Sequence, residues 1–416
     1  MRGPGQRAGG GRRDRAALEG VPSAGPPAPT ELSGGLVHGL GKSLVAPDWP
    51  PLLDEEVRAV LRRYEHTNPL SQNSGPVVVW QSPRPMSAAA LARVGDGSVF
   101  VKRHHRSVRT PDQLRVEHAF ASHLRANGQP VPRVLTSLDG TTVVEMGDLV
   151  YEVHEVVGGI DLYRDALSWS PFRSLDQARV AGRALAAFHE AARGFPLPSR
   201  APGVLINSTV IVGAVDPQAA LQWLLDARPE LARAVVDRPL AKDFARHHLG
   251  LIERAAPLLA ALEPQWGHGD WHPSNLAWSS TAAGAVVAGV FDLGLSNRTF
   301  AMHDLAIALE RSTIDWLDLA GRGRVEADVE AVDALLDGYE DLRPLHGLGG
   351  SALAAVLPVV HVEYALSEVE YFATVVRSKT NVDLAYDDYL IGHTCWFKGP
   401  LGSALLDHLR RRTHRG

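Results

Sequence analysis

The sequence predicts a two-lobed α+β fold, in which a small antiparallel sheet with one main helix is followed by a larger, mainly helical lobe. Two observations predict it. Short strand-like runs separated by glycine-containing turns occupy residues 77–156, whereas long helical patterns dominate the chain beyond them. The pair Gly158-Gly159 interrupts the strand pattern, so we place the lobe boundary there, with an N-terminal lobe at 48–158 and a C-terminal lobe at 159–416.

The N-terminal lobe is predicted to begin with a helix that Asp54 caps and that ends at Tyr64, because apolar residues recur between them at helical spacing. The turn at residues 95–97 is a hairpin signal between two strands. A longer helix carries an apolar stripe and stops at Asn127-Gly128. The predicted strands are Val77–Trp80, Ala88–Val94, Ser98–Lys102, Thr142–Met146 and Leu149–Val156, and the longer helix runs from Pro111 to Ala126.

The C-terminal lobe is predicted to be helical except for one β-rich island at Gly267–Asp292. The island contains two apolar runs separated by a turn, which is the pattern of a hairpin. The predicted helices are Leu175–Ala192, Pro217–Ala227, Arg238–Leu262, Ala327–Gly338, Leu353–Val376 and His393–Arg411.

Residues 1–47 are predicted to form a disordered tail. The segment is rich in Gly, Pro and Arg and has no apolar period, so it cannot bury enough surface to offset the entropy of ordering it. A nucleic-acid-binding arm is the alternative, but no aromatic residues are interleaved with the arginines at its start.

Composition excludes several classes of protein. With 45% hydrophobic and 21% charged residues, the chain is neither wholly disordered nor collagen-like. The formal net charge of −5 gives no basic field, so we expect no nucleic-acid or membrane partner. The longest apolar stretches, such as Ala352–Val360, fall short of the roughly 20 residues of a membrane-spanning helix. The single cysteine, Cys395, excludes a disulfide framework and fits a reducing cytoplasm, while oligomeric state stays open.

Three polar residues of the β-rich island have the pattern of a metal-dependent site. Asp270 and Asn275 stand five residues apart on a proline-containing loop, and Asp292 follows an apolar strand. If the two strands pair, Asn275 and Asp292 reach the same end of the hairpin. Two oxygen ligands of this kind suit Mg²⁺ bound to a nucleotide's phosphates. Asp270 is then placed to accept a proton from an attacking hydroxyl.

The order His-Gly-Asp-x-His-x-x-Asn, an apolar strand and Asp-x-Gly resembles the catalytic and metal-binding loops of the aminoglycoside phosphotransferase family. That family is similar to choline kinases and homoserine kinases and shares the protein-kinase fold. Residues 303–306, His-Asp-Leu-Ala, resemble a segment that follows the metal-binding aspartate in the family. The resemblance implies a two-lobed protein-kinase-like fold, Asp270 as the catalytic residue, and Asn275 and Asp292 as ligands of Mg²⁺.

The resemblance also implies how the small lobe would bind ATP. The strand lysine that holds the phosphates corresponds to Lys102, and the helix glutamate that pairs with it corresponds to Glu117. The adenine would lie against backbone groups of the hinge at Glu155–Gly158, represented by Val157.

The segment that covers the phosphates departs from the protein-kinase pattern, because residues 81–88 lack the closely spaced glycines. Ser87 and neighbouring backbone amides are the candidates that would replace them. Arg84 is either a further phosphate ligand or a solvated side chain.

Several histidines need a separate interpretation. His268 and His272 have the i, i+4 spacing of metal ligands, but Pro273 argues against a continuous helix there and no third soft ligand is in sight. We interpret His268 as a structural residue that holds the loop by hydrogen bonds, and Asp304 as a brace for the same loop.

The acceptor side is harder to predict. The helix near residues 361–372 has a core stripe and a second face formed by Tyr364, Ser367, Glu368 and Tyr371. This acidic, aromatic face either binds a cationic acceptor, as C-terminal helices do in the resembled family, or is an ordinary solvated face. The same question applies to Trp396, Asp383, Asp387 and Asp388.

The sequence therefore predicts a phosphotransferase that depends on ATP and Mg²⁺ and moves the γ-phosphoryl group to a hydroxyl of a small molecule. The acceptor could carry an amine, and its identity stays open. The alternatives are a kinase of peptide Ser or Thr and a catalytically silent pseudokinase. A metal-dependent hydrolase built on His268, Asp270, His272 and Asp292 is least favoured.

Overall fold

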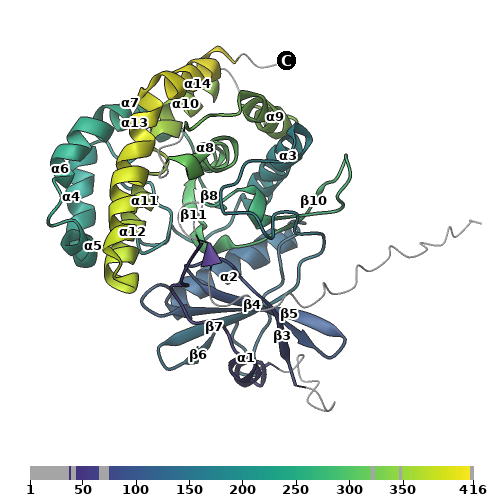
Figure 1. Ribbon diagram of the computed structural model, residues 1–416. Coiled ribbons are helices and arrows are strands. Elements are labelled where there is room, and N and C mark those ends of the chain that lie inside the picture. The colour runs from purple at the N-terminus through teal and green to yellow at the C-terminus, as the bar shows by residue number, and fades with distance from the viewer. Residues whose placement is uncertain (1–36, 39–43, 65–74, 320–323, 346–348, 413–416) are drawn as a thin grey trace, which may run out of the picture.

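The computed structural model describes residues 37–38, 44–64, 75–319, 324–345 and 349–412. The chain forms two lobes, with a five-stranded sheet in the smaller one and helices in the larger one (Figure 1). All strand pairs of the sheet are antiparallel, in the order β3-β4-β5-β7-β6. The bounds are β3 Val77–Gln81, β4 Ala88–Val94, β5 Gly97–His105, β6 Val144–Met146 and β7 Leu149–Glu155.

Helix α2, Pro111–Ala126, connects the sheet to the helical lobe. Thr110 and Gln113 form a capping box at its start, in which each side chain bonds the other residue's backbone amide. The buried Phe120 of α2 packs against Phe188 and Trp266 of the larger lobe. The helix is thus shared by the cores of both lobes.

Helix α1, Asp54–Leu61, packs on the sheet and begins one residue earlier than predicted. Its N-cap is Leu53, so the prediction that Asp54 is the cap was wrong. The Asp54 carboxylate instead accepts a hydrogen bond from the backbone amide of Val78 at 2.8 Å. Asp54, a residue type that commonly caps helices, thus connects helix α1 to strand β3.

The larger lobe contains two short hairpin-like ladders among its helices. Strand β8 (Pro264–Gly267) pairs with β11 (Asn297–Phe300), and β9 (Leu276–Trp278) pairs with β10 (Val287–Val290). The α-helices are α3 Leu175–Ala192, α4 Pro217–Ala227, α5 Pro229–Ala234, α6 Leu240–Asp243, α7 Gly250–Ala260, α8 Ala301–Thr313, α9 Val329–Glu340, α10 Gly349–Val356, α11 Val362–Glu370, α12 Lys379–Asp383, α13 His393–Lys398 and α14 Pro400–Arg411.

Three long predicted helices are divided in the structure. The first has a π-helical stretch at Phe244–Leu249, and the second tightens to a 3₁₀ turn at Leu357–Val359, which contains Pro358. The third is broken at Gly399-Pro400, because proline starts a helix well but cannot donate within one. Helix α8 was not predicted, since nearly all its residues, polar ones included, are buried, so no alternation of core and solvent-facing positions marks it in the sequence.

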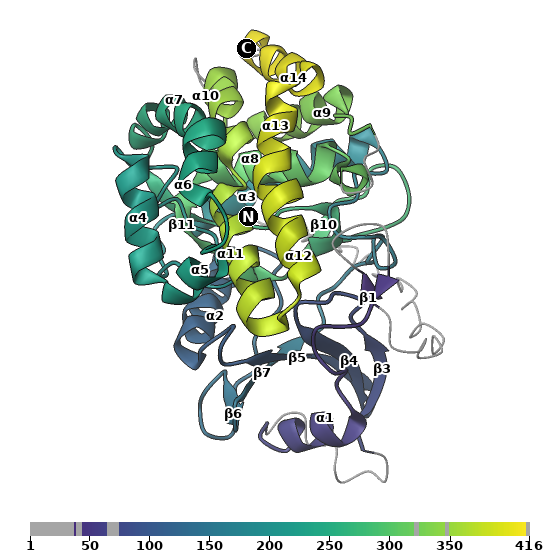
Figure 2. The same ribbon diagram turned by 60° about the vertical axis from the view of Figure 1, so that its left-hand side comes forward.

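One helical run, Gly349–Val376, is by length and apolar composition compatible with crossing a membrane. However, 94% of its most apolar window is buried inside the protein. The run includes α10 and α11 of the larger lobe (Figure 2), and most of its residues belong to the main hydrophobic core, so it acts here as a core element. The continuous apolar stretch Ala352–Val360 is shorter than this run, because the polar residues His361 and Glu363 follow it in the sequence.

The segment predicted to be a tail contains a short ladder, in which Val37–His38 (β1) pairs with Leu44–Val45 (β2). Its other residues up to 43 lie outside the described part of the chain. Immediately after it, Trp49 donates a hydrogen bond to the Tyr371 hydroxyl at 3.1 Å, and that hydroxyl donates to Asp48. The start of the small lobe therefore contacts the large lobe directly.

Candidate active site

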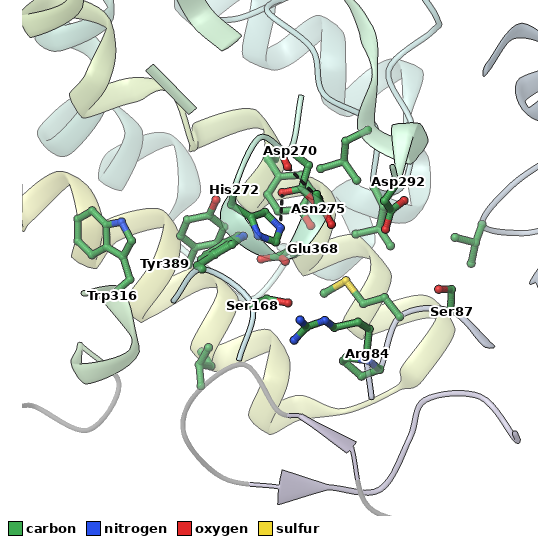
Figure 3. Close-up of a pocket in the computed structure, with 18 of the residues that line it drawn as sticks. Arg84, Ser87, Ser168, Asp270, His272, Asn275, Asp292, Trp316, Glu368 and Tyr389 are labelled. Carbon is green, nitrogen blue, oxygen red and sulfur yellow. Dashed lines mark hydrogen bonds and ion pairs between the residues drawn. The ribbon is translucent and has the colours of Figure 1, made fainter. Parts of the chain in front are cut away.

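The β9–β10 hairpin brings two predicted metal ligands together. Leu276 pairs with Val290, and the backbone amide of Phe291 donates to the carbonyl of Asn275 at 3.1 Å. Asn275 and Asp292 therefore lie at the same end of the ladder, as their spacing had indicated, and both line one cleft between the lobes (Figure 3).

The loop before Asn275 is held by a buried aspartate. Asp304 of α8 accepts hydrogen bonds from the backbone amides of His268 and Gly269, both at 2.7 Å, and pairs with His189 at 2.9 Å. Gly269 has φ of 77°, and a Cβ there would lie 2.6 Å from the carbonyl oxygen of Leu295. The inferred role of Asp304 as a brace is confirmed.

His268 is also structural, as inferred. Its Nδ1 accepts from the amide of Asp270 at 3.1 Å, and its Nε2 donates to the carbonyl of Phe291 at 3.1 Å. Since both ring nitrogens are engaged, His268 cannot ligate a metal in this arrangement. The hydrolase built on His268 and His272 therefore lacks one of its ligands.

Asp270 is held in place through both carboxylate oxygens. Arg311 donates to Oδ1, while the side-chain amide of Asn275 donates to Oδ2 at 3.1 Å and to the Asp270 carbonyl at 2.9 Å. Burial alone would raise the pKa of Asp270, but His272, 3.5 Å away, and Arg311 lower it below its usual range. The carboxylate is thus ionised and oriented toward the cleft.

Arg311 is a site residue that the sequence analysis missed. Its side chain is 1% exposed, and its guanidinium lies over the rings of Trp169 at 4.8 Å and Tyr364 at 4.7 Å. The available signal was the position of Arg311 seven residues, or two helical turns, after Asp304, because a guanidinium on the same buried helix face requires an anionic partner.

Lys102 reaches the cleft from the opposite lobe. Its Nζ lies 2.9 Å from Oδ1 of Asp292. Burial would lower the pKa of Lys102, but Asp292, with contributions from Glu152 and Glu117, raises it above its usual range. The ammonium group is therefore charged beside the predicted metal ligand.

The predicted ion pair between Lys102 and Glu117 is not present. Glu117 is 6% exposed, and its Oε2 has no hydrogen-bond partner among the described residues. Arg200 lies 3.9 Å from it. Sequence spacing put Glu117 on the inner face of α2 correctly, but it could not show that Asp292 would be the nearer carboxylate to Lys102.

Of the remaining candidates for nucleotide binding, some line the cleft and one does not. Ser87 lines the cleft, and so does Arg84, whose Nη1 donates to the carbonyl of Ala166 at 3.0 Å. The interpretation of Arg84 as a solvated side chain was therefore wrong. Val157 of the hinge packs against Gly289, where a Cβ would lie 2.5 Å from its side chain, and is not among the described residues that line the cleft.

The other end of the cleft is aromatic and acidic. Trp169, Trp316 and Tyr389 line it together with Glu368 (Figure 3). Glu368 is 3% exposed, so the solvated-face interpretation of α11 was wrong. Burial raises the pKa of Glu368 to about 8, although Arg311 acts in the opposite direction.

The other acceptor candidates have different positions. Asp388 lines the cleft, whereas Asp383 and Asp387 pair with Arg238. Trp396 packs against a cleft-lining tryptophan at a ring distance of 5.2 Å. Tyr371 contacts the start of the small lobe instead, because the helix turns it away from the cleft.

The donor set at the phosphate end fits Mg²⁺. The side-chain amide nitrogen of Asn275 faces Asp270, so the side-chain amide oxygen of Asn275 is left to ligate a metal ion. The Asp292 side chain is 41% exposed, and its backbone has φ of 61°, a left-handed conformation that non-glycine residues seldom adopt. A carboxylate and an amide oxygen are the hard ligands that Mg²⁺ prefers.

This fold and this cleft define a two-lobed, protein-kinase-like phosphotransferase. The sequence matches the phosphotransferase enzyme family over residues 87–347, and the chain belongs to that family. It is accordingly a small-molecule phosphotransferase enzyme.

Individual relatives are distant. An uncharacterized protein of Deinococcus radiodurans is 26% identical over 271 residues, covering 63% of this chain and 68% of that protein. A microcompartment-associated aminopropanol kinase has a TM-score of 0.52 at 18% identity, covering 86% of this chain and 99% of the kinase. The GDP and kanamycin complex of APH(2″)-IIIa has a TM-score of 0.50 at 14% identity, with coverage of 82% and 99%. These structures show the shared fold.

Proposed function

We propose that this enzyme uses ATP and Mg²⁺ to phosphorylate a hydroxyl group of a small molecule that carries an amine. The observation that supports it best is the cleft itself. One end holds Lys102 and Asp292, the other holds Glu368 among aromatic rings, and Asp270 lies between them. The single exposed thiol of Cys395 agrees with action in a reducing cytoplasm.

Each residue of the phosphate end has a distinct part in this proposal. Lys102 would bind the α- and β-phosphates, while Ser87 and its neighbouring amides would cover them. Asn275 and Asp292 would hold Mg²⁺. When bound, Mg²⁺ would supply positive charge that offsets the negative charge of the nucleotide's phosphates.

Asp270 would orient the acceptor hydroxyl and take its proton as the phosphoryl group moves. Its lowered pKa keeps it ionised at neutral pH, which suits a group that positions the hydroxyl and accepts the proton late. Arg311 and Asn275 hold the two carboxylate oxygens, so little reorganisation is needed during the reaction.

An amine on the acceptor is supported by the charge at the far end of the cleft. Glu368 is buried beside Tyr364 and lines the cleft together with Asp388. Its neighbour Arg311 is bonded to Asp270, so an ammonium group would supply a further positive partner. Aromatic rings such as Trp316 and Tyr389 add favourable faces for a cation. One relative of the same fold is named an aminopropanol kinase, and aminopropanol carries both an amine and a hydroxyl.

The test combines nucleotide binding with product analysis. We expect Mg·ATP to raise the melting temperature of the wild type and to have little effect on Asp292→Asn, with Asp387→Asn as a surface control. Labelled ATP is then incubated with amino alcohols, aminoglycosides and a Ser/Thr peptide. Transfer to the peptide alone would contradict the proposal, and so would equal Mg·ATP stabilisation of Asp292→Asn.

A further inference from the structure

A second cluster of ligand-type side chains lies behind the acceptor end of the cleft. It is formed by Glu310 of α8, His361 at the start of α11 and His393 at the start of α13. Each offers one ligand atom within 4.8 Å of the others. Nδ1 of His393 lies 2.9 Å from Oε1 of Glu310, and Nδ1 of His361 lies 3.9 Å from the same oxygen.

The hydrogen bonds of His361 determine which of its nitrogens is free. Nε2 lies 3.2 Å from the backbone carbonyl of Leu390, which can only accept, and 3.2 Å from the hydroxyl of Thr394, which can donate or accept, so we assign the hydrogen to Nε2. Nδ1 therefore presents a lone pair toward Glu310, and it has no hydrogen-bond partner among the described residues. A histidine anchored to a carbonyl through one nitrogen and free at the other is the usual arrangement of a metal ligand.

Glu310 leaves a second acceptor unsatisfied. Its side chain is fully buried, and Oε2 has no hydrogen-bond partner among the described residues. Arg311 approaches to 3.9 Å but already bonds Asp270. Oε2 of Glu310 and Nδ1 of His361 are thus two buried acceptors without a partner among the described residues, on side chains whose ligand atoms gather within 4.8 Å, and burying them is costly unless a cation binds there.

The net charge of the surroundings is also negative. Three carboxylates, Asp270, Glu310 and Glu368, are grouped around the single guanidinium of Arg311. A divalent cation would balance this excess of negative charge.

We propose that Glu310, His361 and His393 form a site for Zn²⁺, separate from the oxygen-ligand site of Asn275 and Asp292. One carboxylate and two imidazoles are a donor set that zinc accepts, with a further position left for water or substrate. His393 lines the cleft and stacks on Trp316 at 3.5 Å, which gives the ion an approach from the acceptor end.

Zinc at this position would connect helices α8, α11 and α13, which line the acceptor end of the cleft. Arg311 is the residue next to Glu310, so the ion would also fix the arginine that holds Asp270. The role assigned here is to brace the acceptor end, and the site does not depend on which acceptor the enzyme uses.

Two other places could bind zinc and serve as internal controls. His118, Glu152 and His154 also lie close together, but there both carboxylate oxygens of Glu152 have partners, Oε1 with His104 at 3.0 Å and Oε2 with His118 at 2.6 Å, whereas Oε2 of Glu310 has none among the described residues. Cys395 lies 3.4 Å from Nδ1 of His247 near the surface.

The experiment titrates chelator-treated full-length protein with Zn²⁺ alone, in a calorimeter. We expect one equivalent to bind with Kd below about 1 µM. His393→Gln should weaken binding at least ~100-fold, and Glu310→Gln should do the same, whereas His154→Gln and Cys395→Ser should bind like the wild type.

Failure of the wild type to bind would overturn the proposal, as would loss of binding in His154→Gln or Cys395→Ser. If His393→Gln and Glu310→Gln do not fold, Co²⁺ replaces Zn²⁺ in the wild type. Intense visible bands of a four-coordinate ion without a thiolate charge-transfer band support the site. Weak six-coordinate bands or a thiolate band contradict it.

Discussion

The two ends of the cleft carry opposite charge. At the phosphate end, the cations Lys102 and Arg84 accompany the carboxylate of Asp292. At the acceptor end, carboxylates outnumber cations, and Arg311 is the buried cation among them. Phosphates are anionic and amines are cationic, so each end is complementary to a different part of the proposed reaction.

The ends also differ in how they are built. The phosphate end uses Lys102 of strand β5 and the end of the β9–β10 hairpin, and the hairpin residues Asn275 and Asp292 lie within one short segment of the sequence. The acceptor end uses side chains from α8, α11 and α13, which are buried against one another. The first end is a motif and the second is a product of helix packing, so they should respond differently to substitution.

The largest loss of activity is expected for a substitution of Asp270, which lies between the two ends of the cleft. Asp270→Asn keeps the shape of the side chain but cannot accept the proton, so kcat should fall on the order of 10³-fold. Mg·ATP binding should remain, because Asp292 and Lys102 are unchanged. Turnover near the wild-type rate in a coupled ADP assay would show that Asp270 is not the base.

The next effect tests the cation of the acceptor end. Arg311→Met leaves Asp270 buried without its guanidinium, and we expect a loss of about 3–5 kcal/mol in the free energy of unfolding. Arg311→Lys retains the charge and should lose less. Because Arg311 lowers the pKa of Asp270, the acidic limb of the Arg311→Lys pH–rate profile should move to higher pH, if the lysine reaches Asp270 less well. An unmoved limb and unchanged denaturation midpoints would contradict this role.

A smaller effect is expected at Glu368. Its pKa of about 8 means that the carboxyl is mostly neutral at pH 6 and mostly ionised at pH 9. An ammonium acceptor binds the ionised form, so its affinity should rise as pH increases from 6 to 8, by up to tenfold per unit, and then level off. In Glu368→Gln the rise should vanish. Calorimetry across this range measures it, and an identical pH dependence in both proteins would exclude Glu368 as the amine partner.

The smallest change is expected at Glu117, and it tests which carboxylate pairs with Lys102 at the phosphate end. Glu117→Gln should lower Mg·ATP affinity less than tenfold, because the ion pair of Lys102 is with Asp292. Asp292→Asn is the matched comparison. Equal losses in the two variants would indicate that Lys102 pairs with Glu117 when nucleotide is bound.

Prediction from sequence succeeded where interactions are local. The five strands, α2 and the β9–β10 pairing follow from turns and from alternation over a few residues. Asp270, Asn275 and Asp292 were found for the same reason, since a loop and a hairpin hold them within a short segment.

Prediction failed where the partner is distant. Arg311 bonds Asp270 across 41 residues, and His393 bonds Glu310 across 83. No periodic pattern in the sequence indicates such distant pairs. A polar residue inside a buried helix interrupts the apolar stripe, so it gives no sign of the partner that it will contact. The pairing of Lys102 with Asp292 depends in addition on how the two lobes approach each other.

The most direct test of the opposed-charge cleft compares an amino alcohol acceptor with its neutral analogue, in which a methyl group replaces the amine. With labelled ATP and Mg²⁺, we expect kcat/KM to be at least ~10-fold higher for the amine, and the difference to shrink in Glu368→Gln. Equal use of both acceptors by the wild type, or an unchanged preference in Glu368→Gln, would contradict the account.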